Sequence, residues 1–118
     1  MKDEETRDRY LVDEMLRHLE VLAEVVRGGK PALASNAVTR YAAAHAIELV
    51  AEAAEKVSRS FKNANPSVPW NELRPLRREV AHPYDVGAES VNVDQLWRFA
   101  TADAVRISRR LRDATFRA

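Results

Sequence analysis

Five side chains suited to phosphate chemistry lie within eleven residues of this chain: Arg74, Arg77, Arg78, His82 and Tyr84. Histidine exchanges protons near neutral pH, and arginine keeps its charge and presents donors that match phosphate oxygens. Tyrosine adds a hydroxyl donor or an aromatic surface. Such a set is sufficient for metal-free cleavage of a phosphodiester with an adjacent 2′-hydroxyl, because the histidine can take the hydroxyl proton and an arginine can stabilise charge on the phosphoryl oxygens. This reaction requires RNA and leaves a cyclic phosphate.

The spacing leaves two arginines open as the partner of His82. Arg78 and His82 are four residues apart and share a helix face. Arg77 and His82 are five apart, which is about 140° around a regular helix. They converge only if the helix unwinds before Pro83 or if the long arginine side chain wraps around it. The alternative interpretation is a solvated basic helix end near the negative pole of the helix dipole.

A second cluster, His45, Glu48 and Glu52, has the three- and four-residue steps of helical metal sites. A di-metal bundle needs such clusters from several helices, and no matching carboxylate–histidine pair recurs in the sequence. His45 also borders an apolar stripe. We therefore expect no metal site and a packed, hydrogen-bonded His45. His18 has no partner group nearby in the sequence and is expected at the surface or its boundary.

The elements that position these residues are expected to be helices. The chain of 118 residues contains nineteen Ala, three Gly, five Pro and no Cys. This composition is typical of one all-α domain over residues 1–118, and it excludes disulfides, thiolate-held zinc and cysteine nucleophiles. Apolar residues recur at helical spacing between the Gly and Pro positions. The pattern predicts a four-helix bundle with helices over about 5–27, 35–62, 71–82 and 94–112.

The second predicted helix has an apolar arc wide enough to face more than one neighbour. One stripe consists of Val38, Ala42, Ala46, Leu49, Ala53, Val57 and Phe61, and a second of Ala43, Ile47, Val50 and Ala54. The helix is therefore either the centre of the bundle or also part of a subunit contact. Ser35 is its expected N-cap. Residues 63–70 predict a proline-braced loop that ends in an aromatic anchor, Trp70, and residues 83–92 predict a connector.

The formal net charge is +1 but is unevenly spread. Residues 1–56 carry 11 acidic and 8 basic side chains (−3), and residues 57–118 carry 7 acidic and 11 basic ones (+4). A basic half is compatible with a polyanion site, although on charge alone an ordinary solvated surface is the simpler interpretation. No stretch approaches the ~20 apolar residues that span a bilayer, and the charged first residues lack the apolar run of a secretory signal. We expect a cytoplasmic protein.

The segment from Trp70 onward resembles the signature of the HepT-like HEPN proteins. Their pattern is a Trp followed by a short helix with Arg-x4-His-x-Tyr, which corresponds here to Arg77, His82 and Tyr84. The Trp loop also matches, and Ala51-Glu52-Ala53 resembles a Gly-Glu-Ala step in the family's second helix. The similarity covers about residues 9–112.

Two positions depart from the family pattern. Arg78 stands where the family generally has Asn or Asp, so the extra cation could strengthen RNA attraction or take over the role of Arg77. Pro75 lies within the predicted helix over 71–82, one turn before the motif, so either the first turn is separate or the helix is kinked there.

The resemblance implies a HEPN-type bundle that forms a homodimer and acts as a metal-independent endoribonuclease toxin without a cofactor. Arg77 would stabilise the scissile phosphate and His82 would be the general base or acid, with Arg74 and Arg78 as RNA contacts. A partner nucleotidyltransferase antitoxin would silence the site by adding AMP to Tyr84. The adenylate would block the groove and place negative charge where RNA phosphate binds.

Two other functions are compatible with the same residues. The chain could be a non-catalytic module that presents RNA or a nucleotide to a nucleotidyltransferase partner, with its arginines as phosphate contacts. It could also be a purely structural dimer without a nucleic-acid role. Formation of 2′,3′-cyclic ends from an RNA pool separates the nuclease from the non-catalytic module.

Overall fold

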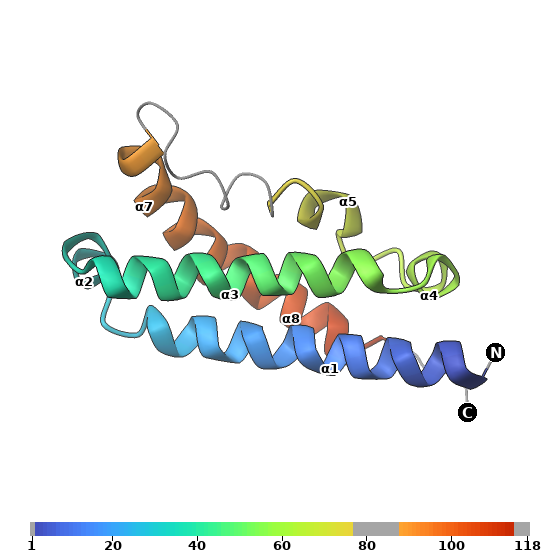
Figure 1. Ribbon diagram of the computed structural model, residues 1–118. Helices are drawn as coiled ribbons and strands as arrows, with labels where there is room; N and C mark the ends of the chain where they lie inside the picture. Colours follow the sequence, from blue (N-terminus) through green and yellow to red (C-terminus); the bar gives the residue numbers. More distant parts are fainter. Residues whose placement is uncertain (1, 77–87, 115–118) are drawn as a thin grey trace.

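The computed structural model describes residues 2–76 and 88–114, and the burial of side chains within residues 3–76 and 93–114. The described residues form helices joined by turns, with no strand among them (Figure 1). This confirms the all-α bundle. The helices are α1 (Lys2–Val25), α2 (Lys30–Ser35), α3 (Ala37–Lys56), α4 (Arg59–Ala64), α5 (Trp70–Leu73), α7 (Ala88–Arg98), η1 (Phe99–Asp103) and α8 (Ala104–Arg112).

The first predicted helix is confirmed as α1. Its first turn carries the acidic residues Asp3, Glu4 and Glu5, whose charges complement the positive pole of the helix dipole. The helix ends just before the two glycines. Gly29 has a φ of 96°, a backbone conformation that residues other than glycine rarely adopt. Its N–H donates to the Val26 carbonyl at 3.0 Å.

The predicted N-cap of the second helix is wrong by one residue. Ser35 is the last residue of the short helix α2, and Asn36 caps α3 instead. The Asn36 side-chain oxygen accepts hydrogen bonds from the backbone N–H groups of Val38 at 2.9 Å and Thr39 at 3.2 Å. Both residues are favourable caps, and the short helix before them decides between the two.

The predicted helix over 35–62 is interrupted at Val57 and Ser58. The cause is a contact with α1: the Asp8 carboxylate accepts the Ser58 N–H at 2.9 Å and the Ser58 hydroxyl at 2.6 Å. The Ser58 hydroxyl oxygen in turn accepts the Phe61 N–H at 3.2 Å and caps α4. Asp8 is only 4% exposed, so these hydrogen bonds take the place of those that water would make to the carboxylate.

The last helix begins at Ala88 rather than near Asp94, so residues 88–92 of the predicted connector are helical. It continues through one π-helical turn, η1, into α8. The Thr101 hydroxyl donates to the Trp97 carbonyl at 2.7 Å beside this turn. Lys30 of α2 binds Asp94 at 2.7 Å, and this hydrogen bond together with the lysine's charge holds the pKa of Asp94 below its usual value.

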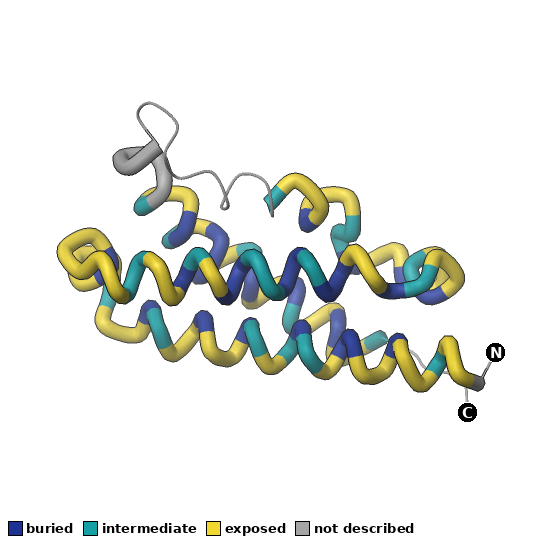
Figure 2. The backbone as a smooth tube through the Cα atoms, in the orientation of Figure 1, coloured by how far each residue is buried: buried dark blue, intermediate teal, exposed yellow. Residues whose placement is uncertain are grey.

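The hydrophobic core lies between α1, α3 and the η1–α8 segment (Figure 2). Met15, Ile47 and Ile107 are among its fully buried side chains. Of the two alternatives for the second predicted helix, the central position in the bundle is confirmed, because α3 contacts α1, α2, α5 and α7. The prediction for the apolar stripe from Val38 to Phe61 is wrong at its beginning, where Val38 is 75% exposed and Ala42 is exposed.

Candidate active site and basic pocket

The loop before α5 is locked to α4 by the predicted aromatic anchor. The Trp70 indole N–H donates to the Asn65 carbonyl at 3.0 Å, and its ring meets Phe61 edge-on at a centroid distance of 6.1 Å. The Asn65 side-chain amide donates to the Phe61 carbonyl at 3.0 Å. The side chain of Val68, a residue of the loop, is buried. These contacts confirm a braced loop, but its bounds are 65–69 and not 63–70, because α4 extends to Ala64 and Trp70 begins α5.

Helix α5 is a single turn whose sides have different roles. Leu73 is 1% exposed and packs into the core, whereas Arg74 is exposed. On the side toward α8, Glu72 forms an ion pair with Arg106 at 3.4 Å. A turn at Arg74 and Pro75 ends α5, so this first helical turn is separate from the chain beyond it. A separate first turn is one of the two consequences expected of Pro75.

Four of the predicted site residues, Arg77, Arg78, His82 and Tyr84, lie outside the described residues. The chain reaches them directly from Leu76, which packs against the core. It is described again from Ala88, where α7 begins, and α5 and α7 lie on the same side of α3 (Figure 1). Arg74 is therefore the predicted site residue whose surroundings are known.

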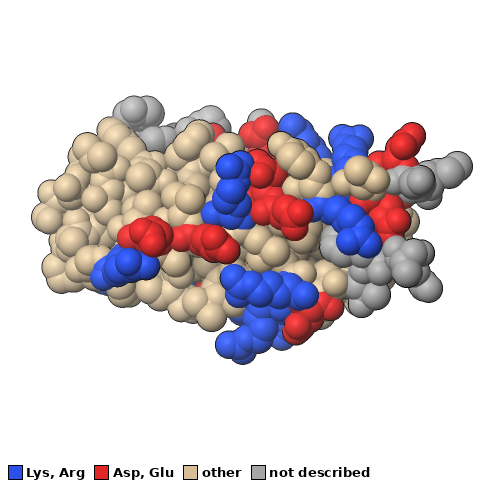
Figure 3. Space-filling view, turned by 90° about the horizontal axis from the view of Figure 1, so that it is seen from below, with Lys and Arg blue, Asp and Glu red and all other residues tan. Residues whose placement is uncertain are grey.

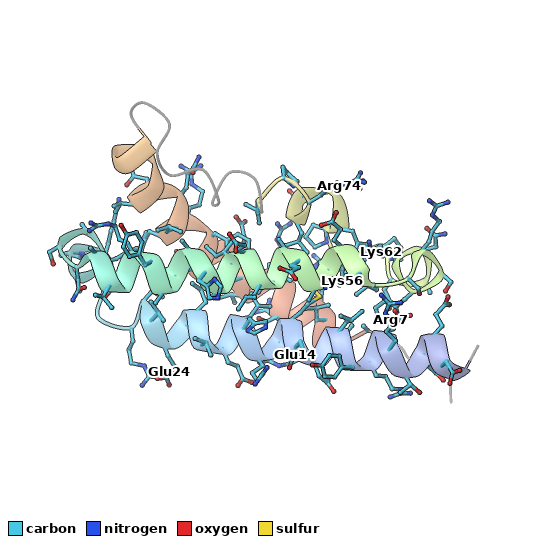
Figure 4. The ribbon with its side chains drawn as sticks, viewed as in Figure 1. Arg7, Glu14, Glu24, Lys56, Lys62 and Arg74 are labelled. Carbon is cyan, nitrogen blue, oxygen red and sulfur yellow. The ribbon has the colours of Figure 1, made fainter. Side chains whose placement is uncertain are left out.

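Arg74 lines a pocket of about 310 Å³ where the end of α3 meets α4 and α5. Its floor contains two alanines of α3, and its polar or aromatic lining residues are Glu55, Arg59, Lys62, Trp70, Asn71 and Arg74. We call this the basic pocket. Lys62 and Arg74 approach it from different elements at this end of α3, whereas Glu24 lies at the far end of α1 (Figure 4).

The cations of the basic pocket repel one another. The pKa of Lys62 is below its usual value chiefly because the ammonium is partly buried, and the charges of Arg74 and Arg59 lower it further. Glu55 and Asp8 act in the opposite direction but do not cancel the shift. The Lys62 ammonium lies 5.8 Å from the centre of the Trp70 ring, within the range of a cation–π contact. The pocket is thus an electropositive surface that would favour an anion.

Arg59 and Lys62 are not among the predicted site residues, because the sequence pattern places them on the outward continuation of one long helix. With the break at Ser58, both residues line the same pocket as Trp70. A signal for it is present in the sequence, since Val57-Ser58 offers an N-cap for a new helix. The deciding partner, Asp8, lies fifty residues away in the sequence.

The expectation of a packed His45 is wrong. Its side chain is 66% exposed and lies 3.9 Å from Glu48. Within residues 2–76 and 88–114, no group of three His, Cys, Asp or Glu side chains could hold a metal ion. His18 is at the surface boundary as expected, but the expectation that it has no nearby partner is wrong, because Glu14 lies 3.9 Å away and four residues before it. Partial burial lowers the pKa of His18, although the charge of Glu14 opposes the shift.

The charged surface elsewhere is mixed. Seen from the α1 side, acidic and basic side chains lie interspersed, and the end that carries α2 shows mainly uncharged side chains (Figure 3). On α8, Arg109, Arg110 and Arg112 are exposed in the last turn, where positive charge complements the helix dipole. Arg106 is held between Glu72 and Asp103. Pairing and dipole effects explain these charges without a ligand.

The described chain is thus an all-α bundle with a basic pocket beside the helix that leads into an arginine–histidine–tyrosine motif. The positive charge of this pocket is suited to an anion such as a phosphate group.

Comparison with known proteins specifies the class further. Residues 15–114 match the model of the ribonuclease HepT-like family, and the chain belongs to this family. The matched region includes the motif residues. It also includes the basic pocket, so both features lie within the family domain.

Two curated relatives come from archaea. The chain is 29% identical over 75 residues to putative RNase MJ1380 of Methanocaldococcus jannaschii, an alignment covering 64% of this chain and 65% of that protein. It is 31% identical over 65 residues to probable ribonuclease HepT of Thermococcus cleftensis, covering 55% and 56%. The chain thus spans just under two thirds and just over half of the lengths of these relatives. No solved structure matches the chain closely. In the described residues, no helix is long and apolar enough to cross a membrane.

Proposed function

We propose that this protein is a metal-independent endoribonuclease that acts as the toxin of a toxin–antitoxin pair, with residues 1–118 as one domain. The observation that carries the proposal is the spacing of Arg77, His82 and Tyr84 within a chain of the ribonuclease HepT-like family. Support comes from the presentation of Arg74 at the surface, three residues before Arg77. Cytoplasmic RNA is the proposed substrate.

The proposed reaction is attack of an RNA 2′-oxygen on the neighbouring phosphorus. The 2′-oxygen–phosphorus bond forms, the bond from phosphorus to the 5′-oxygen breaks, and the products are a 2′,3′-cyclic phosphate and a 5′-hydroxyl. His82 takes the 2′-hydroxyl proton or protonates the leaving oxygen. Arg77 stabilises the charge on the phosphoryl oxygens, and Arg74 and Arg78 bind the strand. Since the nucleophile is part of the substrate, the reaction needs neither a metal-bound water nor a cofactor.

The test is RNA cleavage by single variants in the presence of EDTA. His82→Ala is expected to lower the cleavage rate by about 10²–10⁴-fold, the usual contribution of a general acid or base. Arg77→Ala is expected to lower it to a similar extent, with helicity by circular dichroism unchanged. Arg27→Ala is the control, because Arg27 is an exposed residue in the turn after α1 and pairs locally with Glu24. Undiminished cleavage by both motif variants would refute the assignment.

A second function is favoured by the basic pocket, which needs no catalytic residue to attract an anion. In this alternative the chain is a non-catalytic module that presents RNA or a nucleotide to a nucleotidyltransferase. Incubation of the purified protein with a mixed RNA pool distinguishes the two. Retained RNA without new 2′,3′-cyclic ends supports the module, and new cyclic ends that disappear with His82→Ala support the nuclease.

The proposal includes control by a nucleotidyltransferase antitoxin that adds AMP to Tyr84. The adenylate would introduce a phosphate charge into the site where the RNA phosphate binds, so the modified protein would repel its substrate. Mass spectrometry after coexpression with an adjacent nucleotidyltransferase should reveal one added AMP. Tyr84→Phe should abolish this addition and leave the toxin uninhibited.

We further propose that the active form is a homodimer that brings Arg77 and His82 of two copies together. Support comes from an exposed apolar surface on the first turns of α3, where Val38 is 75% and Tyr41 is 64% exposed. Light scattering of the full chain should give twice the 13.4 kDa monomer mass. A monomeric mass at the concentrations at which cleavage is measured contradicts the dimer.

A further inference from the structure

The basic pocket combines features of a preformed anion site. Among the residues that the structure describes, three cations line it, Arg59, Lys62 and Arg74, and one carboxylate, Glu55. The described lining residues therefore carry a formal charge of about +2, larger than the net charge of +1 for the entire protein. Because like charges raise the energy of the folded state, their concentration here favours an occupant that supplies negative charge.

The pocket is also held in shape without a ligand. Trp70 forms one wall, and its indole hydrogen bond to Asn65 and its edge contact with Phe61 fix the ring. The ring in turn positions the Lys62 ammonium through the cation–π contact. Lys62 also reaches the Glu55 backbone carbonyl at 3.4 Å. An anion therefore meets a Lys62 ammonium whose position is largely set before it binds.

The chain connects the pocket to the catalytic motif. Arg74 lines the pocket, and three peptide units separate it from Arg77, so even a fully extended chain places their Cα atoms within about 11 Å. A single-stranded nucleic acid engages proteins over several nucleotides, typically about 4–16. A strand cleaved at the motif therefore extends far enough for another of its phosphates to reach the pocket.

We propose that the basic pocket is a phosphate-binding subsite that holds the RNA backbone at a nucleotide outside the scissile bond, with Arg59 and Lys62 as its contacts. This inference rests on the proposed function for the identity of the strand. It makes single-stranded RNA longer than a dinucleotide the preferred substrate. The recognition is independent of base sequence, because a phosphate carries no sequence information.

Binding is measured first, in His82→Ala protein so that the probe stays intact. The probe is a fluorescent single-stranded RNA of about twelve nucleotides, a length within the usual site size. Arg59→Gln and Lys62→Gln are each expected to weaken binding about tenfold, since each removes a charged hydrogen-bond donor. Each should also reduce the slope of log affinity against log salt by about 0.7, the value for one phosphate contact on a single strand.

Matched controls remove the same charge elsewhere. Lys56→Gln is the control for Lys62→Gln, because Lys56 is exposed on α3 and pairs with Glu52 at 3.4 Å. Arg27→Gln is the control for Arg59→Gln. Both controls should leave affinity and salt slope near those of the parent protein. Equal effects of control and pocket variants would overturn the subsite, since they would show only a general charge effect.

Cleavage by otherwise unaltered protein separates this inference from the proposed function. The pocket variants should raise KM for the twelve-nucleotide RNA about tenfold with little change in kcat, and the loss should be several times smaller on a dinucleotide. An equal loss on both substrates overturns the subsite even though the nuclease stands. If the parent protein cleaves no RNA, the nuclease fails, and the binding measurement still decides whether the pocket holds RNA.

Competition identifies the source of the phosphate. Inorganic phosphate or AMP at millimolar concentration should displace the long RNA only weakly, because a strand is held at several points. If AMP binds as tightly as the RNA and loses affinity in the pocket variants, the pocket is a mononucleotide site and the strand proposal is overturned.

Discussion

Replacing Asp8 by Ala should destabilise the protein by about 3 kcal/mol. The buried carboxylate accepts two hydrogen bonds from Ser58, and bonds to a charged group contribute about 1.5–3 kcal/mol each. The substitution also removes the group that orients the Ser58 hydroxyl as a cap, an effect of about 1 kcal/mol. Removal of the cost of burying the charge offsets part of this sum. Such a loss lowers the melting temperature by about 12 °C in a chain of this size.

The assay is urea unfolding followed by circular dichroism, with Asp13→Ala as the control because Asp13 is exposed on the same helix. A double-mutant cycle with Ser58→Ala should give a coupling energy of at least about 1 kcal/mol. A loss below about 1 kcal/mol for Asp8→Ala, or strictly additive effects, would refute the explanation of the break. The variant should also weaken RNA binding, since α4 carries Arg59 and Lys62.

Two further predictions concern pH and capping. The folded-state pKa of Lys62 is lowered, so the unfolded chain binds more protons between that value and about 10.5, and stability rises with pH across this interval. Lys62→Gln should therefore be more stable than the parent at pH 7, with the advantage shrinking as pH approaches 10.5 and the ammonium loses its proton. Urea titrations at both pH values, with Lys56→Gln as the control, check this, and a variant less stable at pH 7 contradicts it. Asn36→Ala should cost about 1 kcal/mol, whereas Ser35→Ala should change stability by a few tenths, because only Asn36 caps α3. Equal losses in the two variants would count against this assignment.

The sequence predicts those parts of the fold whose causes are local. The end of α1 follows from Gly29, which alone among the described residues has a positive φ. The anchor at Trp70 follows from the prolines and the aromatic residue at the end of one loop. The predicted start of the last helix is six residues too late, because the prediction follows the apolar face that begins at Trp97 and assigns the residues after Gly87 to a connector.

In the candidate site, too, the sequence predicts the local part and not the part that depends on distant residues. The motif at Arg77, His82 and Tyr84 is visible in the sequence because its members lie within eight residues. The basic pocket is not, because its members come from three helices and the turn after the last of them. Lys62 reaches Trp70 only because Asp8, which lies fifty residues before Ser58, ends α3 at Lys56.

The break between α3 and α4 has a consequence for the position of charge. An uninterrupted helix rises about 1.5 Å per residue and would carry Lys62 about 9 Å past Lys56, away from the loop that ends at Trp70. The break instead places Lys62 and Arg59 on one pocket with Arg74, where each raises the energy of the others. Sites that bind charged ligands commonly contain such repulsion between like charges, because the bound ligand, and not the rest of the fold, neutralises it. An RNA phosphate bound in the pocket would relieve this repulsion. Lys62→Gln is therefore expected both to stabilise the free protein and to weaken its binding of RNA.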